Sequence, residues 1–111
     1  MAVTSKVLIQ PKQAESAQTT QYTAVNCTAY IDKFTVTNTT SANVQFTVNL
    51  VPASGAPAGS NLILNQRAIA PKETYTCPEL SGQILAPGDS ISTVASSAAS
   101  LTIRASGREL T

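Results

Sequence analysis

The stretch spanning residues 31–50 constrains the fold more than any other part of this sequence. A run of small, mostly polar residues, 38–43, separates two segments in which apolar and polar residues alternate. The alternating apolar positions are Phe34, Val36, Val44, Phe46, Val48 and Leu50. This period-two pattern on both sides of a turn predicts a hairpin of two half-buried antiparallel strands. We therefore expect the apolar side chains to form the inner face of a sandwich and residues 38–43 to be an exposed tip.

The alternation is irregular at one place within this stretch. Ile31 and Phe34 are three residues apart. Both side chains can face inward only if the strand gains one extra residue between them. We therefore expect a β-bulge at Asp32 and Lys33.

Turn signals divide the remainder of the chain into short segments. The Pro-, Gly- and Ser-rich run 52–60 is typical of a loop, and Pro87-Gly88-Asp89 predicts a tight turn whose backbone is capped by Asp89. Turns recur roughly every 8–12 residues, as in sandwich proteins, and no stretch has a helical period. The sequence predicts an all-β fold, namely an antiparallel β-sandwich or jelly roll of about eight short strands.

The N-terminal segment is the part whose role the pattern leaves open. The chain has 111 residues, the length of one domain. We expect 13–111 to form a single β-sandwich domain and 1–12 to be extended, either as its first strand or as an arm that pairs with a neighbouring subunit. Pro11 is expected to end this segment, because proline cannot donate to a ladder. The candidates for partner contact or self-association are its apolar residues Val3, Val7, Leu8 and Ile9.

The charge content disfavours several classes of partner. Charged residues make up 12% of the chain and the formal net charge is +1, whereas an average domain is roughly 25% charged. The basic residues are scattered, so we expect neither nucleic acid nor a membrane as partner. No apolar run approaches the roughly 20 residues that span a bilayer. Lys6 interrupts the N-terminal apolar residues, so no secretory signal is expected.

Two cysteines, Cys27 and Cys77, are present. Without a secretory signal the expected site of synthesis is intracellular, where thiols stay reduced. We therefore expect two free, buried thiols, because unpaired cysteine is among the most buried residue types. A disulfide between them is the alternative that the sequence leaves open.

The residues needed for common enzyme chemistry are missing. The chain has no histidine, which excludes His-based nucleophilic catalysis and imidazole zinc sites. The six carboxylates are dispersed along the sequence. Asp89 is interpreted as a turn cap and not as a calcium ligand, because no run of acidic or amide residues surrounds it. We expect a non-enzymatic protein without a metal or another cofactor.

Five segments together resemble a known group of proteins, and they read IDKFTVTN, VNLVPASG, APKETYTCPEL, LAPGDSI and LTIRASGREL. Over residues 29–110 the chain resembles small virion structural proteins of tailed bacteriophages. The likeness is nearest to capsid decoration, or cement, proteins, which fold as β-sandwiches or jelly rolls. The resemblance brings no catalytic residues.

The resemblance implies a self-associating protein, a trimer or dimer, that is located on the virion after assembly in the host cytoplasm. The implied partner is the major capsid protein, or another virion protein, and the implied role is to bind and stabilise the assembled head shell.

Two alternatives to head decoration follow from the same sequence. The first keeps the virion but moves the protein to the collar, neck or tail as an accessory structural protein. The second, of another class, is a carbohydrate- or cell-surface-binding β module. Such a module needs exposed aromatic rings, and the only aromatic residues are Tyr22, Tyr30, Phe34, Phe46 and Tyr75.

Overall fold

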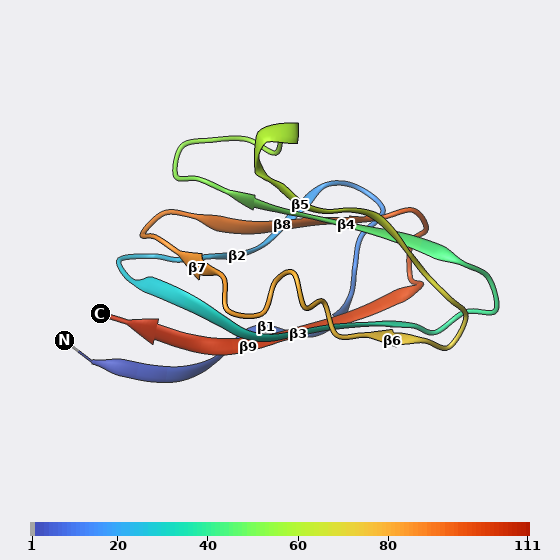
Figure 1. Cartoon of the computed structure of the whole chain (residues 1–111), viewed down its shortest axis with the longest axis horizontal. Coiled ribbons are helices and arrows are strands. Elements are labelled where there is room, and N and C mark those ends of the chain that lie inside the picture. The colour runs from blue at the N-terminus through green and yellow to red at the C-terminus, as the bar shows by residue number, and fades with distance from the viewer. Residues whose placement is uncertain (1) are drawn as a thin grey trace.

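Two antiparallel sheets face each other in the computed structural model, which describes residues 2–111 (Figure 1). Sheet A has the order β1 (Val3–Gln13), β9 (Leu101–Leu110), β3 (Thr28–Asn38) and β6 (Thr74–Tyr75), with β7 (Ile84–Leu85) also paired to β3. Sheet B has the order β2 (Thr19–Thr23), β8 (Ser90–Ala95), β4 (Val44–Val51) and β5 (Leu62–Ile69). One short 3-10 helix, η1 (Gly59–Asn61), precedes β5. The predicted all-β sandwich is confirmed.

No helix among residues 2–111 is long and apolar enough to cross a membrane.

The core lies between the sheets and is centred on two aromatic rings. Phe34 of sheet A and Phe46 of sheet B are fully buried, and their ring centroids are 6.1 Å apart. Val36, Val44 and Val48 are also buried, whereas Leu50 is half-buried. The inner face predicted from the alternation is therefore confirmed at five positions, and its last residue lies at the margin of the core.

The predicted hairpin is wrong, because β3 and β4 belong to different sheets. The segment between them crosses from sheet A to sheet B, and the neighbours of β3 are β9, β6 and β7. Alternation records which face of a strand is buried, but it does not identify the strand beside it. The expected exposed tip is also wrong at one residue, Asn38.

Asn38 is fully buried at the point where the chain leaves sheet A. Its Nδ2 donates to the carbonyl oxygens of Ala42 (2.7 Å) and Ile69 (2.9 Å), and its Oδ1 accepts from the backbone N–H of Thr40 (2.8 Å). A buried amide needs such partners. This side chain therefore fixes the crossover and ties it to the end of β5.

The bulge predicted at Asp32 and Lys33 is confirmed. Register shifts by one residue between Ile31 and Lys33, where β3 pairs with β9. Gly107 of β9 opposes Ile31, and a β-carbon on it would lie 1.8 Å from the carbonyl oxygen of Tyr30. Only glycine lets the two backbones approach this closely.

The N-terminal segment forms strand β1, which is paired with β9; Met1 lies outside the described residues. The strand passes Pro11 and ends at Gln13, so the predicted end at Pro11 is wrong. Register shifts separate Val7 from Ile9 and Ile9 from Lys12. Proline is tolerated there because β1 is an edge strand and is bulged around this residue.

Asp89 caps its turn as predicted and also joins two loops. Its Oδ2 accepts from the N–H of Ala86 (3.0 Å), which closes the Pro87-Gly88 turn. Its Oδ1 accepts from the N–H of Ala53 (3.0 Å) in the long loop after β4. Gly88 has φ +92°, the left-handed conformation that this turn requires.

Replacing Gly107 by alanine is expected to lower the free energy of unfolding by about 2 kcal/mol or more, because the methyl group would force β3 and β9 apart. Urea denaturation measures this change. Gly59→Ala is the matched control: a β-carbon there meets no atom within 4 Å, so we expect a change below about 0.5 kcal/mol. Equal stability of the two variants would contradict the tight contact at Gly107.

Candidate functional site

Three large apolar side chains are exposed in the described part of the chain. The exposed fractions are 64% for Val3, 69% for Val25 and 57% for Ile84. Single exposed apolar residues are ordinary on a protein surface, but a group of them at one place marks a contact site. Whether the three residues form such a group depends on where the strand ladders place them.

The ladders place these residues at the same end of the sandwich. Leu110 lies between Val3 and Thr28 in the register of sheet A, and Ile84 opposes Tyr30 two residues further along β3. Val25 belongs to the β2–β3 connection, which leads directly into β3. Figure 1 shows both termini, this connection and β7 at one end of the molecule. We call the surface formed by Val3, Val25 and Ile84 the apolar end.

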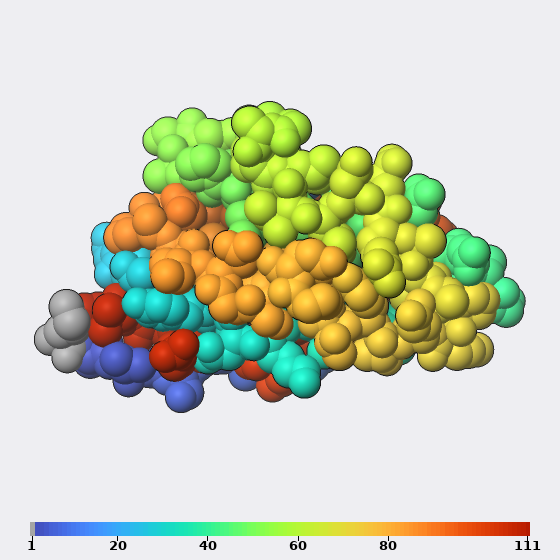
Figure 2. Space-filling view, viewed as in Figure 1, coloured from blue at the N-terminus to red at the C-terminus, as the bar shows by residue number. Residues whose placement is uncertain are grey.

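The space-filling view shows how the segments that contribute to the apolar end adjoin one another (Figure 2). The β2–β3 connection (cyan) and the β7 segment (orange) adjoin there, and β1 (blue) lies along the margin of the molecule (Figure 2). These segments are far apart in the sequence. The fold therefore gathers the exposed apolar residues from three separate segments.

A shallow groove on the outer side of sheet A lies next to this end. It has a volume of about 380 Å³ and is lined by Ser5, Lys6, Val7, Asp32, Ser106 and Gly107. The carboxylate of Asp32 accepts two hydrogen bonds from Arg108, each 3.0 Å long. The Arg108 guanidinium also lies 4.9 Å from the ring centre of Tyr30. The carboxylate of the groove is thus engaged by a bidentate partner.

A polar cluster links the two sheets close to the groove. Glu109 of sheet A accepts a hydrogen bond from the Tyr22 hydroxyl of sheet B and one from Lys6 Nζ (3.3 Å). The hydrogen bond from Tyr22 lowers the pKa of Glu109, with a smaller effect from Lys6. Burial and the neighbouring Glu109 raise the pKa of Tyr22. Glu109 is therefore ionised and Tyr22 protonated at neutral pH, which suits a fixed donor–acceptor pair holding the sheets together.

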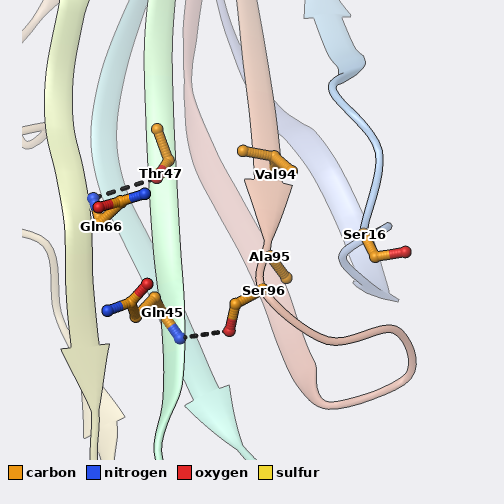
Figure 3. Close-up of a pocket in the computed structure, with 7 residues that line it drawn as sticks. All are labelled: Ser16, Gln45, Thr47, Gln66, Val94, Ala95 and Ser96. Carbon is orange, nitrogen blue, oxygen red and sulfur yellow. Dashed lines mark hydrogen bonds between the residues drawn. The ribbon is translucent and has the colours of Figure 1, made fainter.

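A second hollow, of about 230 Å³, lies on the outer face of sheet B, and Figure 3 shows its lining. It is formed by Ser16, Gln45, Thr47, Gln66, Val94, Ala95 and Ser96. Two of its hydroxyls already accept backbone hydrogen bonds: Thr47 from the N–H of Gln66 (3.0 Å) and Ser96 from the N–H of Gln45 (2.9 Å). None of these lining residues is a carboxylate, lysine or cysteine, so no general base stands beside the hydroxyls.

The four residues predicted for partner contact are divided by the first bulge of β1. Val3 is exposed and Val7 is half-buried, and both lie on the outer side of sheet A. Leu8 and Ile9 belong to the core, with exposed fractions of 6% and 2%. Only Val3 and Val7 are therefore accessible to a partner.

Both cysteines are free and buried, as expected. Cys27 lies 3.9 Å from the Tyr22 hydroxyl. Cys77 follows β6, outside any strand, and burial raises its pKa to about 12. Its thiol therefore stays protonated at neutral pH and is a weak nucleophile.

Within residues 2–111, no three acidic, cysteine or histidine side chains lie together in an arrangement able to hold a metal ion. Comparison of the chain with protein-family models, with curated proteins and with solved structures found no match.

Tyr22→Phe is expected to weaken the dependence of stability on acid pH. The pKa of Glu109 is lowered in the folded state, so its contribution to stability is present above the ordinary value of 4.5 and is lost as pH falls through the folded value. The variant lacks the phenol donor that is the main cause. Its free energy of unfolding should therefore fall less than that of the wild type between about pH 6 and about pH 3. Urea denaturation at both pH values measures the difference.

Tyr30→Phe is the control for this experiment, because the Tyr30 ring packs under Arg108 and not against Glu109. It should keep the wild-type dependence on pH. If Tyr22→Phe and the wild type lose the same stability on acidification, the proposed role of the Tyr22–Glu109 bond is wrong.

Cys77 is expected to react with a thiol reagent only when the chain unfolds. At about pH 8 little thiolate is present when the pKa is near 12, and the sulfur is fully buried. Labelling of the Cys27→Ala variant with a coloured disulfide reagent measures Cys77 alone. The rate should rise at least about a hundredfold in denaturant. Fast labelling of the native variant would show that Cys77 is accessible.

Proposed function

We propose that this chain is a non-enzymatic virion structural protein that binds the assembled head shell in many copies and stabilises it, as capsid decoration proteins do. The observation that carries the proposal is the apolar end. Val3, Val25 and Ile84 are more than half exposed at one end of an elongated domain of 46 × 26 × 20 Å. A domain of this shape can stand on a surface by one end, and burial of that end against a shell would remove apolar area from water.

The charge distribution supports attachment by apolar contact. The net charge is +1, and three salt bridges pair Lys6 with Glu109, Lys12 with Glu15 and Arg108 with Asp32. Little net field is left to repel neighbouring copies on a crowded surface. The resemblance of residues 29–110 to phage structural proteins points to the same setting.

The aromatic residues give no support to a carbohydrate-binding module. Phe34 and Phe46 are fully buried, and Tyr22 is 9% exposed. Tyr30 and Tyr75 are half-buried, with the guanidinium groups of Arg108 and Arg67 over their rings. No ring in the described chain is left as an open platform for a sugar.

The first test is the number of copies on purified particles of a virus that encodes this chain. Quantitative mass spectrometry is expected to find hundreds of copies per particle, the number that a closed shell requires. About a dozen copies would identify a collar, neck or tail protein. Absence from the particle would overturn the virion proposal altogether.

The second test asks whether the apolar end makes the contact. Particles stripped of the protein are incubated with the wild type, with Ile84→Asp or with Val25→Asp. Occupancy should fall at least about tenfold for each aspartate variant, because a buried, unpaired carboxylate opposes the contact. Ala98→Asp is the matched control, because Ala98 is an exposed residue of the β8–β9 connection at the opposite end. Equal binding by all four proteins would exclude the apolar end as the contact.

A further inference from the structure

The sheet edges differ in how much free backbone they present within residues 2–111. β6 and β7 have two residues each. β2 and β5 are interrupted by register shifts against their single neighbours. In β1, by contrast, residues 3–7 pair with β9 in five consecutive positions without a shift. This run is the longest regular edge in the described structure, and such an edge is a template for another strand.

The hydrogen-bond phase of β1 fixes which groups point away from the sheet. Ala2 and Thr111 exchange both backbone hydrogen bonds, each 3.0 Å long. Exchanging and non-exchanging pairs alternate along an antiparallel ladder. Thr4 and Lys6 therefore direct their backbone groups toward β9. The residues that direct N–H and C=O toward the open edge are Val3, Ser5 and Val7.

We propose that this edge pairs with the same edge of a second copy, antiparallel and with the two-fold axis at Ser5. In this register Ser5 opposes Ser5 of the second copy, and Val3 opposes Val7. All three outward residues of each copy then form exchanging pairs, which gives six backbone hydrogen bonds. The two A sheets become one continuous sheet.

The side chains favour this register over its neighbours. Lys6 is the only charged residue of the run Val-Thr-Ser-Lys-Val. With the axis at Ser5 it opposes Thr4 of the second copy. An axis at Lys6 would place two ammonium groups opposite each other, and it would bring the bulge after Val7 into the ladder. An axis at Thr4 would leave Val7 without a partner inside the run 3–7.

The same features favour a second copy over another partner. A two-fold contact is self-complementary, so each residue must fit the one at the mirrored position. The run 3–7 meets this condition, with valine at both ends and serine at the centre. Arg108, on the neighbouring strand β9, opposes Ser5 within the chain and is already paired with Asp32. It therefore adds little repulsion across the axis.

Ser5→Pro tests the edge. Proline removes an N–H that points away from β9, and prolines are tolerated at such positions of edge strands. Sedimentation equilibrium in the micromolar range should find the wild type at twice the chain mass of 11.5 kDa and the variant at 11.5 kDa. Ser5→Thr, which keeps the donor, is the matched control and should remain a dimer. Circular dichroism checks that each variant is folded.

A charge exchange tests the register. Val3→Glu and Val7→Lys should each weaken the dimer at least about tenfold, because each sets a charge opposite a valine. The double variant should recover the dimer, since the two introduced charges face each other across the axis. Within one copy positions 3 and 7 are about 13 Å apart along the strand, so an intrachain pair does not explain the recovery.

The outcomes separate this proposal from the proposed function. A monomeric wild type, or a Ser5→Pro variant that stays dimeric and folded, would overturn the β1 pairing. Should Ser5→Pro fail to fold, the charge exchange decides, and lack of recovery overturns the register. If Ile84→Asp loses particle binding but remains a dimer, the result supports the apolar end as the contact with the particle and leaves the β1 pairing unchanged. Each proposal can therefore fail alone.

Discussion

The insertion of the last strand between the first and the third is the constraint on which the rest of the structure depends. β9 pairs with β1 on one side and with β3 on the other. It supplies Leu101, Ile103 and Ala105 to the core, and it contains the glycine that admits the bulge of β3. Sheet A therefore completes only when segments about a hundred residues apart meet, a non-local topology that folds slowly.

The two sheets are held by a dry centre and by polar contacts toward the margins. Phe34 and Phe46 meet in the centre. At one margin Tyr22 reaches from β2 to Glu109 of β9. Elsewhere Arg67 of β5 lies 4.2 Å from the ring centre of Tyr75 of β6.

The Tyr75 hydroxyl is fixed by Glu79, and desolvation together with this carboxylate raises the pKa of Tyr75 to about 12. Aromatic rings with a polar group suit sites that are part dry and part wet. Tyr22 and Tyr75 accordingly join the sheets toward the margins, and Phe34 and Phe46 join them in the dry centre.

The sequence allowed the faces of strands to be predicted, but not their neighbours. Alternation identified Phe34, Val36 and Phe46 as inward residues, and the three-residue step from Ile31 indicated the bulge. Pairing of β3 with β9 is non-local, so no local pattern distinguished a hairpin from a crossover between sheets. For the same reason, no pattern in the sequence indicated the contact between Lys6 and Glu109, which are 103 residues apart.

The burial of two of the four N-terminal candidate residues could have been predicted from the sequence. Val7, Leu8 and Ile9 are three consecutive apolar residues. A regular strand cannot direct adjacent side chains to one face, so burial of both Leu8 and Ile9 requires a bulge. The apolar end could not be predicted in this way. Val25 and Ile84 come together only because the fold brings the β2–β3 connection beside β7.

The proposed pairing and the apolar end are connected by geometry. The two-fold axis at Ser5 lies two residues, about 7 Å, from Val3. Antiparallel pairing about this axis points the long axes of the two copies in opposite directions, so their apolar ends lie near the axis but face opposite ways. Each copy then extends past the apolar end of the other, and end-on contact with a flat shell is open only to an unpaired copy. The β1 pairing and end-on attachment therefore compete with each other, and dissociation of the dimer precedes attachment.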